Sequence, residues 1–140
     1  MKHILSFAAL ALVVFTVQSV DAQTNEEPLY ALSFDAPKAA KAGTDAACLL
    51  TVTPKTGWTL KTQTPFKMEV SSKADVELPK TKFTAKDFVD AEEPNKKINA
   101  GFKATKAGKH TIDAKLTFFV CSDSICKRQK GAAVYSVDAK

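Results

Sequence analysis

The chain has 140 residues, of which 25% are charged and 45% are hydrophobic, and its formal net charge is +5 at pH 7. Its lysines are spread through nearly every segment, without the arginine tracts and interleaved aromatic residues of nucleic-acid-binding surfaces. A chain of this length suits one domain with a single core. The composition therefore predicts one globular domain that does not bind nucleic acid.

The first residues have the pattern of a secretory leader. A short positive start, Met1–His3, precedes the almost wholly apolar run Ile4–Val17, and small residues suited to signal peptidase end at Ala22. The apolar run is shorter than the roughly 20 residues of a comfortable membrane span. We expect a signal peptide over residues 1–22 and a single mature domain over 23–140, periplasmic or secreted, monomeric and without stable membrane insertion.

Short segments of alternating hydrophobicity fill the mature chain. In the longest, His110–Val120, apolar residues occupy every second position. The segment Lys38–Gly43 has no apolar stripe and is expected to be a loop. About seven or eight short strands, many turns and no convincing helix predict an all-β fold, an immunoglobulin-like antiparallel β-sandwich. The expected strands are Leu29–Phe34, Ala46–Thr53, Trp58–Leu60, Phe66–Val70, Val76–Leu78, Ile98–Ala104, His110–Val120 and Gly131–Val137.

The segment Lys80–Pro94 lacks clean periodicity. Phe83, Phe88 and Val89 stand there among charged residues. Loops of this length inside a small domain are uncommon and are often functional. We therefore interpret the segment as a functional loop.

Three cysteines, Cys48, Cys121 and Cys126, leave one thiol unpaired if a disulfide forms. A bond from Cys48 to Cys121 beside Trp58 would follow the immunoglobulin pattern. Strand parity argues against it, because Cys48 falls on a core-facing row and Cys121 on the row opposite the apolar face, unless a bulge precedes Cys121. A local bond from Cys121 to Cys126 is easier, because the residues between them can turn. We expect the local bond and a buried, inert Cys48.

The short loop also bears on what such a bond does. Closing a few residues stabilises a fold little, whereas strained or exposed disulfides are easily reduced. Lys127 and Arg128 follow Cys126 and favour a thiolate, although they also suit a solvated strand end, and Asp123 opposes thiolate formation at Cys121. The pattern favours a redox pair over a structural staple.

Two other kinds of cysteine chemistry fit the sequence poorly. Zinc sites use closely spaced ligand pairs, and beyond Cys121 and Cys126 the mature chain offers only His110. A cysteine hydrolase needs a base close to its nucleophile, and His110 begins the long strand that Cys121 follows. We therefore expect no metal and no cofactor.

Three segments, in the same order, resemble the N-terminal domain of the thiol:disulfide interchange protein DsbD. They are the strand and turn Thr53–Trp58, the segment Ala74–Pro79, and the apolar strand with two cysteines, Leu116–Cys126. The last is the most specific. This chain has Lys127-Arg128-Gln129 where that family commonly has prolines.

The resemblance implies an immunoglobulin-like domain whose two cysteines cycle between dithiol and disulfide. Carried over by position, Cys126 would be the attacking sulfur that forms the mixed disulfide with a partner, and Cys121 would be the resolving one. Phe88 is similar to an aromatic cap over the pair, and Asp87 to a carboxylate near the sulfurs. The other interpretation of Phe88 is an ordinary loop anchor in the core.

Two functions follow as expectations. The first is a thiol:disulfide exchange module that passes electrons between a membrane reductase and a periplasmic thioredoxin-fold oxidoreductase, the partners that the resemblance implies. The second is a non-catalytic secreted binding or adaptor domain in which the bond between Cys121 and Cys126 only fixes a hairpin.

Overall fold

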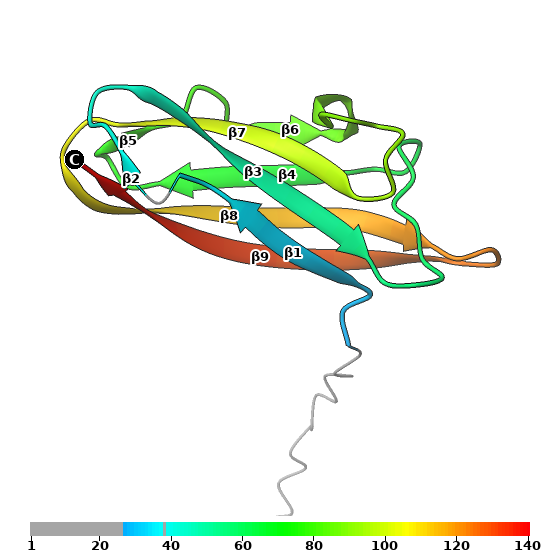
Figure 1. Ribbon diagram of the computed structural model, residues 1–140. Coiled ribbons are helices and arrows are strands. Elements are labelled where there is room, and N and C mark those ends of the chain that lie inside the picture. The colour runs from blue at the N-terminus through cyan, green and yellow to red at the C-terminus, as the bar shows by residue number, and fades with distance from the viewer. Residues whose placement is uncertain (1–26, 38) are drawn as a thin grey trace, which may run out of the picture.

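The computed structural model describes residues 27–37 and 39–140, so the predicted signal peptide, residues 1–22, lies outside the described residues. Within them, nine strands and one short 3-10 helix follow one another along the chain (Figure 1). The elements are β1 (Tyr30–Asp35), β2 (Ala39–Ala40), β3 (Asp45–Pro54), β4 (Lys67–Ser72), β5 (Val76–Glu77), β6 (Lys82–Thr84), η1 (Ala85–Asp87), β7 (Lys96–Ala104), β8 (Gly108–Cys121) and β9 (Cys126–Ala139).

The strands form two sheets, and their order is that of an immunoglobulin-like sandwich. One sheet has the order β1-β3-β7-β5 and the other β2-β9-β8-β4-β6. These orders correspond to the A-B-E-D and G-F-C arrangements of immunoglobulin domains, with β2 and β6 added at the edges of the second sheet. Every pairing is antiparallel except that of β2 with β9. The predicted all-β, immunoglobulin-like fold is confirmed.

The core follows from the alternating pattern of the strands. Every second residue of β8 from Ile112 to Val120 is buried, because successive side chains of a strand point to opposite faces. Burying one such row from each sheet supplies the main driving force for folding. The largest fully buried side chains are Phe102, Phe118, Leu50, Met68 and Ile98.

Four expectations about individual segments need correction. Ala39–Ala40 is a strand and not loop, because it pairs in parallel with the end of β9. Trp58–Leu60 is not a strand, and Thr59 forms only one isolated bridge. The segment Lys80–Pro94 contains β6 and η1. The final strand begins at Cys126 and not at Gly131, because pairing with β8 holds charged residues in a strand that their hydrophobicity does not reveal.

The β8–β9 hairpin places the two cysteines. Its register runs without interruption from the pair Gly108 and Ala139 to the pair Cys121 and Cys126, so no bulge precedes Cys121. Cys121 therefore lies on the outer face of the second sheet, opposite the row that ends at Val120, as the sequence parity predicted. The tip of the hairpin extends past the rest of the sandwich (Figure 1). Among the described residues no helix has the length and apolar character needed to cross a membrane.

Candidate functional site

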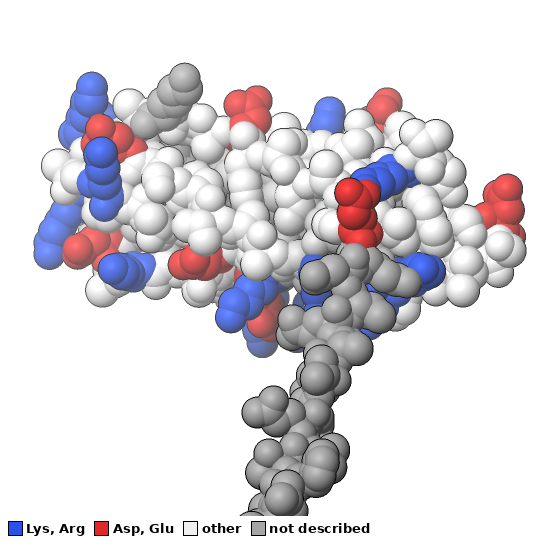
Figure 2. All heavy atoms as spheres, turned by 90° about the horizontal axis from the view of Figure 1, so that it is seen from below, with Lys and Arg blue, Asp and Glu red and all other residues white. Residues whose placement is uncertain are grey.

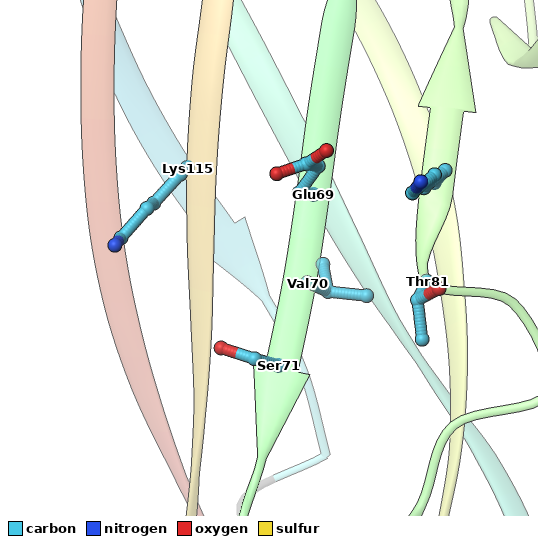
Figure 3. A pocket seen from close by; sticks show the side chains of 6 residues that line it. Glu69, Val70, Ser71, Thr81 and Lys115 are labelled. Atoms are coloured by element: carbon cyan, nitrogen blue, oxygen red, sulfur yellow. The ribbon is translucent and has the colours of Figure 1, made fainter.

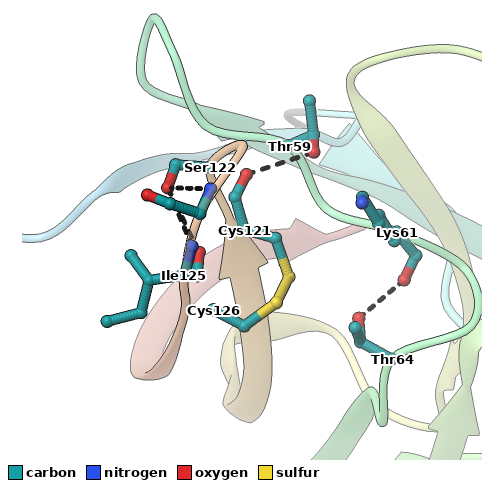
Figure 4. Close-up of a disulfide and its surroundings, with 8 residues drawn as sticks. Thr59, Lys61, Thr64, Cys121, Ser122, Ile125 and Cys126 are labelled. Atoms are coloured by element: carbon teal, nitrogen blue, oxygen red, sulfur yellow. Dashed lines mark hydrogen bonds between the residues drawn. A yellow bond between two sulfur atoms is a disulfide. The ribbon is translucent and has the colours of Figure 1, made fainter.

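A disulfide joins Cys121 at the end of β8 to Cys126 at the start of β9. The sulfur atoms lie 2.00 Å apart, the Cα atoms are 3.9 Å apart, and the two residues are direct partners across the hairpin (Figure 4). Cys48 is free and buried. The predicted local bond is confirmed, and the cross-core bond to Cys48 is absent.

The turn between the cysteines is fixed by one serine. The Ser122 amide donates to the carbonyl of Ile125 at 2.8 Å. The Ser122 hydroxyl oxygen accepts from the amides of Ser124 and Ile125 at 3.4 and 3.3 Å (Figure 4). Serine is suited to this position because its short side chain can satisfy the backbone of the residues that follow it. The turn therefore holds the two strand ends together independently of the disulfide.

Cys121 is also held from its other side. The strand β4 pairs with β8 only as far as Lys67 and Thr117. Beyond that point Thr59 takes the neighbouring place, because its amide donates to the Cys121 carbonyl at 2.9 Å and the Cys121 amide donates to the Thr59 carbonyl at 2.8 Å. The Thr59 hydroxyl adds a bond to the same Cys121 carbonyl at 3.2 Å. No feature of the sequence links Thr59 to Cys121, and the sequence analysis missed it.

The two bonded cysteines differ in exposure. Cys121 is 2% exposed, whereas Cys126 is exposed to solvent. The segment at Thr59 is bridged to Cys121, whereas among the described strands the pairing of Cys126 is with Cys121 of β8. A molecule approaching from solvent therefore meets Cys126 first.

The turn Lys61–Thr64 lies beside the disulfide. The Thr64 amide and hydroxyl both donate to the Lys61 carbonyl, at 3.2 and 2.7 Å. In Figure 4 the sulfur atoms lie on the side of the hairpin that faces Lys61 and Thr64. The sequence shows only turn-forming residues here, so its position near the sulfurs depends on the tertiary fold.

A shallow depression adjoins this end of the second sheet. Its volume is about 390 Å³, and its lining combines aromatic and apolar side chains with two cations. It is lined by Pro65, Phe66, Lys67, Thr117, Phe119 and Arg128.

Phe88, the predicted cap, lies in the core. It is 9% exposed, and its ring meets that of Phe66 edge-on at a centroid distance of 4.9 Å. Its backbone forms an isolated bridge with Ile98. These contacts are those of the loop anchor, the other interpretation given to Phe88, and they are made with the core rather than with the cysteines.

Asp87, the predicted carboxylate near the sulfurs, has other partners. It caps η1 by accepting from the Thr84 amide at 2.8 Å, and it forms an ion pair with Lys80. The hydrogen bond from Lys80, followed by that from the Thr84 backbone, lowers the pKa of Asp87 below its ordinary value. The structure thus brings Cys121 and Cys126 together and gives Asp87 and Phe88 contacts elsewhere.

Cys48 lies in the core between the sheets. It is 0% exposed, and burial raises the pKa of its thiol to about 11. A thiol that stays protonated is a poor nucleophile. This agrees with the predicted buried, inert cysteine.

No metal-binding arrangement was found in the part of the chain that the structure describes, where no group of three or more His, Cys, Asp or Glu residues could hold an ion. His110 lies near the start of β8, with its Nε2 atom 2.7 Å from the Lys106 carbonyl oxygen. It is therefore separated from Cys121 by most of the strand.

No family model matches the chain, and no curated protein does. Solved structures with a similar arrangement include a cohesin module of a family 33 glycoside hydrolase from Clostridium perfringens, at 7% identity and a TM-score of 0.49, covering 80% of this chain and 97% of the module. A FixG-related protein from Vibrio parahaemolyticus has 15% identity and a TM-score of 0.42, with 80% and 97% covered. AggA, the major subunit of aggregative adherence fimbriae type I from Escherichia coli, has 10% identity and a TM-score of 0.38, with 79% and 94% covered. These likenesses assign the chain neither an activity nor a partner.

Proposed function

We propose that the bond between Cys121 and Cys126 is a redox-active disulfide that exchanges with cysteine thiols of a partner protein. The observation that supports this most directly is the unequal exposure of the two residues, 2% for Cys121 against an exposed Cys126. Exchange proceeds by attack of a thiolate on one sulfur while the other leaves, so access decides which sulfur is attacked. The exposed Cys126 receives the partner, and the enclosed Cys121 leaves.

The exchange balances in two steps. A partner thiolate attacks Sγ of Cys126, a mixed disulfide forms, and the bond to Cys121 breaks with release of its thiolate, which takes up a proton. A second thiol of the partner then attacks the partner sulfur of the mixed disulfide and releases Cys126. The partner dithiol is oxidised to a disulfide, and the pair here gains two electrons and two protons. The reverse sequence returns them to an acceptor.

The surroundings of the pair favour this chemistry. Arg128 lies on the same face as Cys126, two residues along β9, and a nearby cation favours a thiolate. The Ser122 bonds keep the two strand ends adjacent without the disulfide, and the Thr59 bonds hold the Cys121 end in place. The reduced pair is therefore held ready to close again.

The wider role that we propose is that of a monomeric periplasmic carrier, which receives electrons from a membrane reductase and passes them to a thioredoxin-fold oxidoreductase. This part rests on the resemblance to the N-terminal domain of DsbD. The competing function is a secreted binding or adaptor domain with a structural disulfide. Because the hairpin is already closed by the backbone bonds of its long strands, a staple at this place has little left to stabilise.

Reduction of the folded protein separates the two functions. Residues 23–140 are incubated with millimolar dithiothreitol, and free thiols are counted by alkylation and mass spectrometry while the fold is monitored by circular dichroism. An exchange module gains two accessible thiols and stays folded. A pair that remains oxidised until the protein unfolds would show that the bond is only structural.

Variants that each lack one cysteine of the pair test the assigned roles. The Cys121→Ser variant leaves the exposed Cys126 thiol and should form a mixed disulfide with oxidised glutathione at least about tenfold faster than Cys126→Ser, since access controls the rate. Cys48 is retained in both variants as an internal buried control. Equal rates, or a faster Cys126→Ser variant, would reverse the assignment.

A further inference from the structure

The outer face of the second sheet is strongly basic next to the disulfide. Strand parity and register place five cations in the three rows of this face that follow the disulfide, on four adjacent strands. All five side chains belong to exposed residues. They are Arg128 and Lys130 of β9, Lys115 of β8, Lys67 of β4 and Lys82 of β6, and we call this set the basic outer face.

The cations continue directly from the disulfide. Two residues along the hairpin from Cys121 and Cys126, in the next outward-facing pair, Arg128 lies opposite Phe119. In the next outward-facing row Lys130, Thr117 and Lys67 are aligned across β9, β8 and β4. In the row after that, Lys115 is followed by Glu69 and Lys82. A partner that reaches Cys126 along this sheet therefore lies on these cations.

In the three rows next to the disulfide, a single carboxylate offsets this positive charge. Glu69 forms an ion pair with Lys67 at 3.0 Å. Its pKa is lowered first by Lys67 and to a smaller extent by Lys82 and Lys115, so these lysines surround one anion. Figure 3 shows Lys115 extending away from Glu69, in the direction of β9. In these three rows five cations and one anion leave an excess of four positive charges. Farther from the disulfide the same face carries Asp113 and then the pair Lys109 and Asp138, so its excess over the whole sheet is three, and the positive charge is greatest at the end next to the cysteines.

The charge is thus concentrated, although the lysines look evenly spread along the sequence. In the view from below, Lys and Arg side chains lie along the lower border of the molecule, with Asp and Glu side chains among them (Figure 2). Folding brings them together because they come from strands far apart in the chain. Concentrated charge of one sign raises the local concentration and the association rate of oppositely charged molecules.

The basic outer face also has two shallow depressions that can accommodate side chains of a partner. The depression of about 390 Å³ near the disulfide includes Lys67, Arg128 and Phe119 in its lining. A second shallow depression of about 500 Å³ continues along β8 and β9, between Lys115 and Lys130. Both offer apolar contact next to a cation, an arrangement that suits the carboxylate and methylene groups of glutamate or aspartate side chains.

We propose that the basic outer face docks an acidic segment that flanks the reacting cysteine of the partner protein. This inference rests on the proposed function, since the disulfide at the end of the face is what makes a cysteine-bearing partner the occupant. A protein segment fits better than a nucleic acid, because the face has one arginine and one partly exposed aromatic residue, Phe119, whereas proteins that bind single-stranded nucleic acid stack successive bases on several aromatic side chains. Complementary charge then orients the partner and raises its association rate, and the partner's cysteine thiol carries out the exchange with the disulfide.

Three synthetic peptides test the inference. Each has one cysteine in the same frame, flanked on both sides by glutamates, by lysines or by serines. The second-order rate of opening of the disulfide in residues 23–140 is measured with each peptide, and with dithiothreitol as an uncharged reductant. We expect the acidic peptide to react about tenfold faster than the basic one at low salt, and the difference to collapse near 1 M NaCl, where the Debye length is about 3 Å.

Charge-reversal variants locate the effect. The double variant Lys115→Glu, Lys130→Glu should lose most of the advantage of the acidic peptide and keep its rate with dithiothreitol. The control is the double variant Lys41→Glu, Lys73→Glu, which makes the same change in net charge on exposed lysines outside the basic outer face. A loss of equal size in the control would mean that only net charge matters, and it would overturn the inference.

The outcomes distinguish this inference from the proposed function. If dithiothreitol opens the disulfide of the folded protein but the three peptides react at rates set only by their own thiols, the docking surface is wrong and the exchange function stands. If dithiothreitol fails, the proposed function itself is wrong. Binding of heparin that depends on Lys115 and Lys130, without discrimination among the peptides, would identify a polyanion site and overturn the acidic-segment proposal.

Discussion

Thr59 and Cys121 lie 62 residues apart in the sequence, yet they form an antiparallel β-bridge. In this bridge the amide of each residue donates to the carbonyl of the other, at 2.9 and 2.8 Å. This bridge continues the second sheet past the end of β4. It encloses Cys121 and leaves Cys126 open, and so it creates the asymmetry on which the proposed exchange depends.

Removing the Thr59 hydroxyl should weaken this bridge. Thr59→Ala loses the side-chain bond to the Cys121 carbonyl, and a partly buried bond of this kind contributes about 0.5–1.5 kcal/mol. Urea denaturation should show a loss in that range, and amide exchange at Cys121 should accelerate. Thr62→Ala, in the same segment, is the control. An unchanged exchange rate at Cys121 would show that the backbone bonds alone hold the strand end.

Gly131 lies where β1 crosses β9. A Cβ atom at Gly131 would lie 2.8 Å from the Tyr30 hydroxyl and 3.2 Å from Leu32 Cδ1, and that hydroxyl is held by a bond to the Lys130 carbonyl at 2.6 Å. Gly131→Ala should therefore destabilise the protein by about 1–3 kcal/mol through overpacking. Gly101→Ala is the matched control, because the nearest atom would be 3.9 Å away. Equal melting temperatures for the two variants would contradict the predicted clash.

Phe88 should behave as a core residue. Phe88→Ala removes a ring packed on Phe66 and should cost about 3–5 kcal/mol, measured by chemical denaturation. Val89→Ala, 60% exposed, should change stability by less than about 0.5 kcal/mol. Phe88→Leu, which retains more of the volume, should stay folded, and its disulfide should react with dithiothreitol at the wild-type rate. A marked acceleration in Phe88→Leu would instead support the cap.

Stability should fall in alkali because of Cys48. The pKa of Cys48 is about 11 in the folded protein, above the ordinary value of 9.0. As the pH rises, the unfolded chain therefore releases this proton first, and the free energy of unfolding decreases. The stabilisation is complete below pH 9 and is lost as the pH rises toward 11, by on the order of 2 kcal/mol. Denaturation curves between pH 8 and about 11 should show this decline, and Cys48→Ala should make it shallower. A slope unaltered in Cys48→Ala would assign the decline to Tyr135, whose pKa is also raised by burial.

Asp87 should contribute in the opposite pH range. Its pKa lies below the ordinary 3.8, so its stabilisation is present above that value and is lost as the pH falls below it. Asp87→Asn removes the charge and the ion pair with Lys80 but keeps an oxygen that can accept from the Thr84 amide, and it should cost about 0.5–1 kcal/mol at pH 7. Denaturation at pH 7 and at pH 3 measures the difference, with Glu92→Gln as the control. A cost that is the same at both values would exclude the charged carboxylate as its source.

The sequence alone determined two features: the strands with alternating hydrophobicity, and the local disulfide between Cys121 and Cys126. The row from Ile112 to Val120 had to face a core, and parity then placed Cys121 on the other face. The residues between Cys121 and Cys126 allow a turn, so their disulfide was within reach of sequence reasoning. Short-range physics of this kind depends only on neighbours along the chain.

Only the tertiary structure decided what surrounds the pair. Thr59 reaches Cys121, Phe88 turns into the core, and cations of four strands meet on one face, because each depends on which strands become neighbours. Strand order is set by the packing of two whole sheets, and period-two patterns are alike in every strand. The sequence could therefore specify the disulfide, whereas its exposure and its charged surroundings emerged only when distant strands came together.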